Sequence, residues 1–322
     1  MILWLLPDAF DERQKQYLDT LRTNAINNKA FLKFDIENPA VSRWTTQNNS
    51  SDWEEIYRCW ISDATKFKQT NIAQVSGSVT NSNLDSDIPI LSLEDAARLI
   101  TIPLFLNFEN AYNDVQFIKC VVDKSTRKQV FEKIHNAEIV TKGGGIGEVK
   151  NELRRQTNPL ILRFKMFVLT DSDCKFLDTP APDAIDVAEI CTENKVEFHT
   201  LRRRMIENYF PLELLYESVP KESLDNDINY KKVQAFYSLN TEQRFCLHLK
   251  KGLNRADLHS NIYDDLQGET KQLLGNGFRG IGDWFSRENK QNVIHKLMHR
   301  NIECSEVINL AAKIKNYIRT PA

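Results

Sequence analysis

Short apolar runs alternate with amphipathic segments over residues 98–210 of the chain. Four of the runs have the length of buried strands, and the segments between them carry apolar residues at helical spacing. The predicted strands are Ile102–Phe108, Ala137–Thr141, Ile161–Thr170 and Val196–Leu201. The predicted helices are Asp114–Lys133, with a break near Ser125, a helix from a glycine-rich turn at 143–147 to about Gln156, and Ala184–Asn194. This alternation is typical of a parallel α/β sheet with right-handed crossovers.

The flanking parts of the chain have different patterns. The apolar pattern of residues 1–97 predicts an N-terminal α/β region. Its tryptophans form either a partner-binding surface or part of a buried core. Its strands are Ile2–Leu6 and Ala30–Ile36, its helices Asp11–Arg22 and Asp52–Lys68, and its tryptophans Trp4, Trp44, Trp53 and Trp60. Gln74–Asp87 is rich in Ser, Asn, Thr and Gly, which indicates a linker or an exposed loop. Residues 211–322 have a helical pattern, so we expect three regions: 1–97, 98–210 and 211–322.

Composition narrows the class of protein. The chain has 322 residues, 41% hydrophobic and 27% charged, which suits a globular protein with a substantial core. Its net charge of −2 excludes a uniformly basic surface for nucleic acid, so any basic surface must be local. The six cysteines include no C-x-x-C pair, which argues against a zinc knuckle and fits reduced thiols in the cytoplasm. No stretch has the apolar length of a membrane span, so we expect a cytoplasmic protein with no membrane partner.

Polar groups follow three of the predicted strands. Glu109 ends the first, the glycines at 143–147 end the second, and Asp171 with Asp173 ends the third. The carboxyl ends of parallel strands meet at one edge of a sheet, where ligands gather. A Glu facing two Asp is a suitable set of oxygen ligands for Mg²⁺ or Mn²⁺. The alternative for Asp171 and Asp173 is an Asx turn after a strand, which needs no metal.

This order of motifs resembles the Toprim fold, the catalytic domain of topoisomerases, bacterial primases and OLD-like nucleases. The family has an apolar strand ending in Glu, a glycine turn, and a later strand ending in Asp-x-Asp, and the likeness covers about residues 98–210. The segment Thr200–Pro211 is similar to the Arg-Arg-x-Ile-Glu-Asn-Tyr segment that follows the Toprim core of OLD-like and DUF4435-type nucleases. The run 249–252 and the turn around Gly277 and Phe278 resemble their C-terminal helical part. Two departures are Asn110 where the family usually has Gly, and Asp114, which lies one residue later than expected.

The resemblance implies roles for individual residues. Glu109 is expected to act as a general base, a metal ligand, or both, and Lys251 to neutralise transition-state charge. One or two Mg²⁺ or Mn²⁺ ions are expected on five carboxylates: Glu109, Asp114, Asp171, Asp173 and Glu207. Phosphate contacts are expected from Gly143, Gly144, Gly145, Arg203 and Arg204. Plainer alternatives are an intrahelical ion pair of Arg203 with Glu207 and an ordinary solvated Lys251.

The resulting hypothesis is a metal-dependent nuclease that acts on DNA, or on RNA including tRNA. Relatives of this kind serve in antiphage defence, often beside an SMC/ABC-like ATPase, so a partner protein and a homo-oligomer are both expected. One rival is a catalytically silent Toprim docking module. Another is a haloacid-dehalogenase-like phosphatase, although Lys175 stands where that family has Thr or Val.

Other motifs fail simple tests. Glu148 breaks a Rossmann fingerprint begun at Gly143, and no Gly-Lys-Ser/Thr follows for a P-loop. His295 and His299 share a helix face, but a zincin needs Glu at position 296, which is Lys296.

Overall fold

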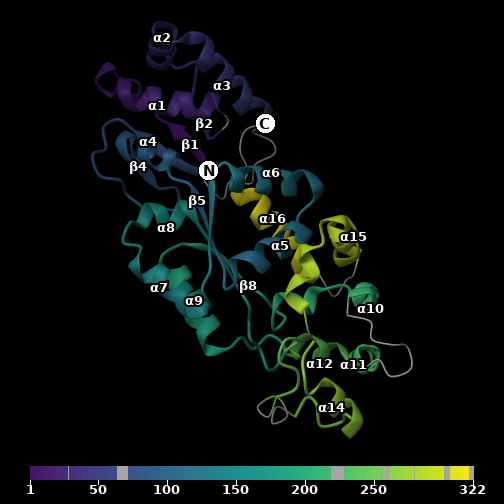
Figure 1. Ribbon diagram of the computed structural model, residues 1–322. Coiled ribbons are helices and arrows are strands. Elements are labelled where there is room, and N and C mark those ends of the chain that lie inside the picture. The colour runs from purple at the N-terminus through teal and green to yellow at the C-terminus, as the bar shows by residue number, and fades with distance from the viewer. Residues whose placement is uncertain are drawn as a thin grey trace. The chain divides into compact units, whose positions relative to one another are not determined.

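The chain forms two compact units in the computed structural model. The structure describes residues 1–27, 29–63, 72–218, 228–254, 257, 261–278, 280–300 and 305–318. The first unit contains residues 1–104 and 316–322, and the second contains residues 105–315. Each contains a four-stranded parallel sheet flanked by helices, which confirms the α/β class predicted from the sequence (Figure 1). This division differs from the three predicted regions, because residues 211–315 belong to the same unit as the second sheet.

The first unit has the strand order β2-β1-β3-β4. Its strands are β1 (Ile2–Leu5), β2 (Phe31–Lys33), β3 (Ile72–Ser76) and β4 (Ile90–Ser92). Its helices are α1 (Lys15–Ile26), α2 (Pro39–Gln47), α3 (Ser50–Asp63) and α4 (Leu93–Thr101). Phe10, Phe34, Trp44 and Trp53 form an aromatic cluster with neighbouring ring centroids 5.5 to 5.8 Å apart. Trp44 and Trp53 are buried, so these two tryptophans serve the core rather than a partner-binding surface.

The second unit has the strand order β6-β5-β7-β8. Its strands are β5 (Leu104–Asn107), β6 (Ile139–Lys142), β7 (Met166–Thr170) and β8 (Glu197–Thr200). The helices between them are α5 (Ala111–Val121), α6 (Lys124–His135), α7 (Ile146–Arg155), α8 (Pro159–Lys165) and α9 (Pro182–Glu193). Helices α7, α8 and α9 lie on one side of this sheet, and α5 and α6 lie on the other (Figure 1). Met166 and Val168 of β7 pack against Val149, Leu153 and Val187, which anchors α7 and α9.

The rest of the second unit is helical. It contains α10 (Leu215–Ser218), α11 (Ile228–Tyr237), α12 (Thr241–Cys246), α14 (Gly268–Leu274), α15 (Gln291–Arg300) and most of α16 (Ser305–Ile318). Short 3₁₀ turns lie at Ile206–Tyr209, Leu212–Leu214, Ile281–Ser286 and Glu288–Lys290. His295 and His299 on α15 donate to the carbonyl oxygens of Cys120 and Val121, at 3.1 and 2.8 Å. The histidine pair therefore satisfies free carbonyl groups at the end of α5, which agrees with rejecting a zinc motif.

Two predicted elements differ from the structure, and a third agrees with it. The predicted strand Ile161–Thr170 is split into α8 and the strand Met166–Thr170, because the Asn158 side chain caps a helix that begins with Pro159. The predicted linker from Gln74 overlaps β3, which extends to Ser76 and is only five residues long. The break expected near Ser125 in the segment Asp114–Lys133 is present at Val122 and Asp123, and the Asp123 side chain caps α6.

Candidate functional site

The carboxyl edge of the second sheet brings together acidic residues that follow two neighbouring strands. Glu109 comes two residues after β5, and Asp171 comes directly after β7. The backbone N–H of Asp171 donates to Glu109 Oε1 at 2.9 Å, so the two strand ends are in contact. Strand β5 lies between β6 and β7, which follow it in the chain, so the direction of winding reverses beside it. Ligands of parallel α/β sheets bind at such switch points.

The glycine turn between β6 and α7 shapes the backbone around Glu109. The N–H groups of Gly144 and Gly145 donate to the Glu109 carbonyl oxygen at 3.1 and 2.8 Å. Gly145 has φ +85°, a value that favours glycine. A Cβ at Gly143 would lie 2.6 Å from the backbone nitrogen of Ala111, so this position also needs glycine. The two N–H groups are used to hold Glu109, whereas the sequence predicted that they bind phosphate.

The loop after β7 is held by the segment that follows β8. The backbone N–H of Ile206 donates to Asp171 Oδ1 at 3.0 Å. The backbone N–H of Asp173 donates to the Arg204 carbonyl oxygen at 2.9 Å. Asp173 has φ +47°, in the left-handed region that Asp adopts more readily than most residues. These bonds fix the Asp171–Asp173 loop beside Glu109.

Asp114 joins this edge from the first turn of α5. Asn110, which stands where the Toprim pattern has Gly, caps α5 by accepting a hydrogen bond from the N–H of Asn113. Asp114 Oδ2 in turn accepts from the Asn110 N–H at 2.9 Å. The departure from the family pattern is therefore a helix cap, and it leaves Asp114 buried within range of the other carboxylates.

Glu207 reaches the same edge and contacts a lysine from the helical part. Its carboxylate is buried, with Oε1 2.9 Å from Lys250 Nζ. Although burial lowers the pKa of Lys250, contact with Glu207 raises it above its ordinary value, so the ammonium stays charged. Both lysines are exposed, but Lys250 forms this ion pair with Glu207, whereas the sequence predicted Lys251 at the site. The structure thus brings Lys250 rather than Lys251 to the carboxylates, a choice that two adjacent lysines in the sequence could not decide.

Burial and mutual repulsion raise the pKa values of three of these carboxyl groups. Burial, with repulsion from Asp173, raises the pKa of Glu109 to about 7. Burial, with a smaller contribution from Glu207, raises the pKa of Asp114 to about 7. Burial and the neighbouring Glu109 raise the pKa of Asp171 well above its ordinary value. Five carboxylates close enough to repel one another are the condition that a divalent cation relieves.

The five residues fit Mg²⁺ or Mn²⁺ by their chemistry. No group of three or more His, Cys, Asp and Glu side chains is arranged to hold a metal as it stands, within the described part of the chain. Glu109, Asp114 and Asp171 instead accept backbone N–H groups. Both carboxylate oxygens of Glu207 are buried without a well-aligned hydrogen bond, and the ammonium of Lys250 is the cation beside one of them. All donors are hard oxygens, the ligand type that these two cations prefer.

Arg203 and Arg204 are buried, at 5% and 6% exposure, and take part in internal contacts. The Arg203 guanidinium donates to the Asn208 carbonyl oxygen at 2.6 Å and lies 3.7 Å from the ring centroid of Phe245. Arg204 forms an ion pair with Asp257 at 2.7 Å. Both side chains attach the segment after β8 to the helical part of the unit. This arrangement does not support the predicted contacts of these arginines with phosphate, because their charged groups face the interior.

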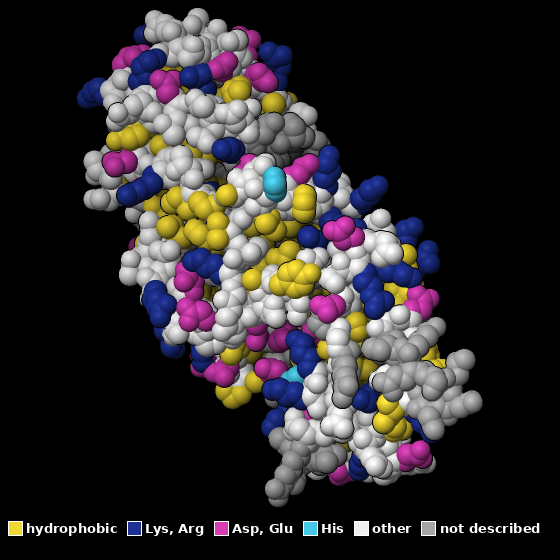
Figure 2. Space-filling view, viewed as in Figure 1, with side chains coloured by type: hydrophobic (Ala, Val, Ile, Leu, Met, Phe, Trp, Pro, Cys, Tyr) yellow, Lys and Arg dark blue, Asp and Glu magenta, His cyan; other side chains and the backbone are white. Residues whose placement is uncertain are grey.

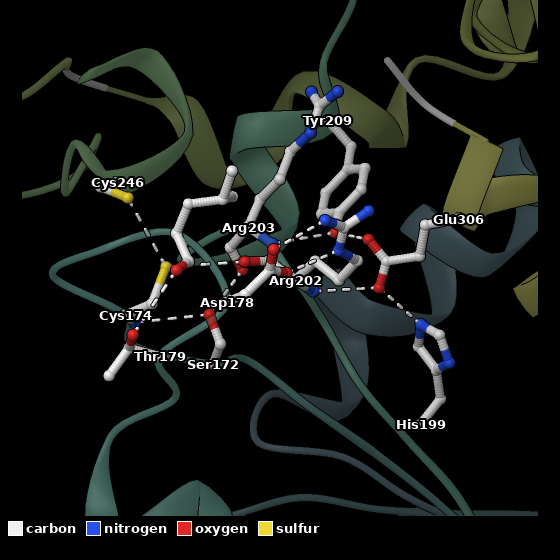
Figure 3. Close-up of polar contacts among 11 residues, drawn as sticks. Ser172, Cys174, Asp178, Thr179, His199, Arg202, Arg203, Tyr209, Cys246 and Glu306 are labelled. Carbon is white, nitrogen blue, oxygen red and sulfur yellow. Dashed lines mark hydrogen bonds and ion pairs between the residues drawn. The ribbon is translucent and has the colours of Figure 1, made fainter. Parts of the chain in front are cut away.

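Glu306, at the start of α16, binds the segment after β8 through hydrogen bonds of its carboxylate (Figure 3). Its Oε1 accepts from the Arg202 N–H at 2.9 Å and lies 2.8 Å from His199 Nε2. Its other oxygen accepts a hydrogen bond from the Tyr209 hydroxyl. The Tyr209 oxygen accepts from the Arg203 N–H at 3.1 Å. Nothing in the sequence pattern pointed to this network, because its members lie about a hundred residues apart.

Two buried thiols join the loop after β7 to α12. Cys174 Sγ lies 3.9 Å from Cys246 Sγ, and the two sulfurs are drawn facing each other in Figure 3. All described cysteines are free thiols.

The charged surface is mixed. On the face drawn in Figure 2, Lys and Arg side chains lie among Asp and Glu side chains in small groups, as far as the described residues show. This matches the expectation that basic surface is local. Within the described residues, no helix is long and apolar enough to span a membrane.

No family model, curated protein or solved structure matches the chain. The Toprim resemblance therefore stays a prediction from sequence motifs, and function is inferred from the geometry of the site.

Proposed function

We propose that the protein is a Mg²⁺- or Mn²⁺-dependent phosphodiesterase that cleaves nucleic acid. The observation that carries this proposal is the convergence of five acidic side chains and one lysine at the switch point of the second sheet. Two of the acids, Glu109 and Asp171, are linked by a backbone hydrogen bond, and a third, Glu207, is paired with Lys250. The pKa values of Glu109, Asp114 and Asp171 are raised, and such clusters of acids with raised pKa values are found more often at catalytic sites than elsewhere in proteins.

In this proposal Asp171, Asp173 and Glu207 hold the metal, and Glu109 either binds it or accepts a proton from the attacking water. The metal supplies Lewis-acid stabilisation of the phosphate and a more acidic bound water. With a pKa of about 7, Glu109 can exist in both the protonated and deprotonated forms near neutral pH. Lys250 keeps its positive charge beside the carboxylates and can stabilise negative charge that develops on phosphate.

The substrate is proposed to be DNA, or RNA including tRNA. A role as an antiphage effector that works with an ATPase partner is a further proposal, which rests on the sequence resemblance alone. The chain has a net charge of −2 and only local basic groups. These groups suit a nucleic acid that is bound at one place on the surface rather than one that is wrapped around the protein.

The test is cleavage of plasmid DNA and total RNA by the purified full chain, alone and with its genomic neighbour, in Mg²⁺, Mn²⁺ or EDTA. We expect metal-dependent cleavage that Glu109→Ala and Asp171→Ala each reduce at least about a hundredfold. Asp186→Ala is the matched control, because Asp186 is an exposed acid on α9 in the same unit. Cleavage that persists in EDTA, or in both site variants, would refute the proposal.

A catalytically silent docking module is the second candidate. It is favoured by the finding that no three metal-binding side chains among the described residues are already arranged around a shared point. Partner binding that is unchanged in Glu109→Ala, with no cleavage of any substrate by the native chain, would support it.

A further inference from the structure

Glu207 differs from the other buried acids of the site in what surrounds its charge. Glu109, Asp114 and Asp171 accept hydrogen bonds from backbone N–H groups. The Glu207 side chain is 0% exposed, and neither of its oxygens has a well-aligned hydrogen bond. Its charge is compensated by the ion pair with Lys250, in which Nζ lies 2.9 Å from Oε1. A buried carboxylate without a neighbouring cation is strongly unfavourable, so the position beside Glu207 must always be held by a positive charge.

The ammonium of Lys250 lies on the solvent side of this carboxylate. The Lys250 side chain is 39% exposed, whereas that of Glu207 is fully buried. Burial raises the pKa values of the other buried acids, and attraction to the ammonium opposes that rise at Glu109, Asp114 and Asp171. The ammonium is thus within range of four acids at once. A cation that approaches them from solvent meets the ammonium first.

The two main chains are fixed, but the lysine side chain is not. Beside Glu207, the N–H of Ile206 donates to Asp171 Oδ1 at 3.0 Å. A Cβ at Gly277 would lie 2.1 Å from the Lys250 carbonyl oxygen, so a glycine turn packs tightly on the main chain of the lysine. The ammonium itself is carried on a flexible four-carbon stem. It can leave Glu207 without movement of either main chain.

A divalent cation would remove the reason for this ion pair. A metal bound to Glu207 neutralises the carboxylate in place of the ammonium, and it repels the ammonium because the two have like charges at short range. The displaced ammonium then has a new partner in a phosphate oxygen of the substrate.

We propose that Lys250 exchanges partners when the metal binds: its ammonium holds the place of the metal beside Glu207 in the metal-free protein, and the incoming ion displaces it toward the phosphate of the substrate. The inference rests on the proposed function, because it requires a divalent cation and a phosphodiester at the carboxylate edge. It makes metal binding a condition for the binding of phosphate by Lys250. By linkage, phosphate in turn strengthens the binding of the metal.

The first test is a double-mutant cycle on the binding of Mn²⁺ by the full chain, followed by the electron paramagnetic resonance signal of free Mn²⁺. Lys250→Met keeps most of the stem and removes the charge, and it should bind Mn²⁺ about tenfold more tightly than the native chain. In a Glu207→Gln background the same substitution should change the affinity by about twofold at most. The comparison separates competition for Glu207 from the general effect of removing one positive charge.

Lys251→Met is the matched control, because it removes the same charge from the next position, which is also exposed. Its affinity for Mn²⁺ should stay within about twofold of that of the native chain. Circular dichroism establishes that each variant is folded. An equal effect of Lys250→Met in both backgrounds, or no effect in either, would overturn the inference.

The second test needs no variant, so it decides the question if a variant does not fold. Crystals of the native chain are prepared without metal and with Mn²⁺, which is located by its anomalous scattering. The distance from Lys250 Nζ to Glu207 Oε1 should increase from 2.9 Å to beyond the limit of an ion pair, about 4 Å. Mn²⁺ bound at the carboxylates with this ion pair intact would overturn the inference.

Metal-dependent cleavage is measured separately on the native chain. Cleavage and bound Mn²⁺ with an intact ion pair overturn this inference and leave the proposed function. Displacement of Lys250 by Mn²⁺ without cleavage of any nucleic acid supports this inference and counts against the proposed function. No binding of Mn²⁺ at the carboxylates overturns both.

Discussion

The buried carboxylates make the stability of the metal-free protein depend on pH in an unusual direction. The pKa values of Glu109 and Asp114 are raised to about 7 from ordinary values of 4.5 and 3.8. At pH values between the ordinary pKa values and about 7, the folded chain retains protons that the unfolded chain releases. The free energy of unfolding therefore falls as the pH rises through this window, and the stabilisation is complete only below the ordinary pKa values. Most proteins, with carboxylates of lowered pKa, behave in the opposite way at acidic pH.

The size of the effect follows from the shift of Glu109. A shift of one pKa unit corresponds to about 1.4 kcal/mol, so the rise from 4.5 to about 7 amounts to about 3 kcal/mol. Asp114 and Glu109 titrate as a coupled set, so a second full contribution should not be added. For a unit of this size, about 3 kcal/mol corresponds to a decrease of roughly 6–12 °C in unfolding temperature.

The assay is thermal unfolding followed by circular dichroism, in EDTA at low ionic strength, from about pH 5 to about pH 8. We expect the unfolding temperature of the native chain to fall by roughly 6–12 °C over this pH range. The unfolding temperature of a Glu109→Gln/Asp114→Asn double variant should depend less on pH. Mg²⁺ at tenfold excess over its Kd should add about 1.4 kcal/mol at the higher pH. It should add little at the lower pH, where protons occupy the carboxylates.

Two results would refute this reasoning. A free energy of unfolding that is constant or rises over this range in EDTA would show that the carboxylates are not destabilised by their surroundings. An equal effect of Mg²⁺ at both ends of the range would show that the cation binds elsewhere.

Two further substitutions test how the site is built. Lys250→Ala should destabilise the chain by about 2 kcal/mol, because it leaves the buried carboxylate of Glu207 unpaired, and should abolish metal-dependent cleavage; Lys251→Ala should change neither quantity in unfolding and cleavage assays. Gly143→Ala should reduce cleavage at least about tenfold, because its Cβ would displace the turn that holds Glu109. Gly147→Ala, in open space on α7, should leave cleavage intact and raise stability by about 0.5–1 kcal/mol, and native-like cleavage by the Gly143 variant would contradict the argument.

The sequence predicted the parts of the site that depend on strand ends. Glu109 and Asp171 follow apolar runs directly, and parallel pairing then places both at one edge whatever the details of the loops. Asp114 could be placed near that edge because it begins the next helix. The strand boundaries were less predictable, since the apolar run from Ile161 suits either a strand or a buried helix. The helix cap at Asn158 makes the first part of this run helical.

The surroundings of the site could not be predicted, because they depend on contacts that are distant in sequence. A basic run such as Arg202–Arg204 looks like a phosphate site when only residue types are considered. In the structure Arg203 and Arg204 face the interior, and the main-chain carbonyl of Arg204 holds Asp173. The choice between two adjacent lysines and the role of Glu306 depend in the same way on tertiary packing.

The attachment of Glu207 to Lys250 has a consequence for any shortened form of the protein. A fragment that ends near residue 210 would retain all five acids but lose Lys250 and the acidic partner of Arg204, Asp257. Under the proposed function, proteolysis between the sheet and the helices would therefore abolish cleavage rather than liberate an active core.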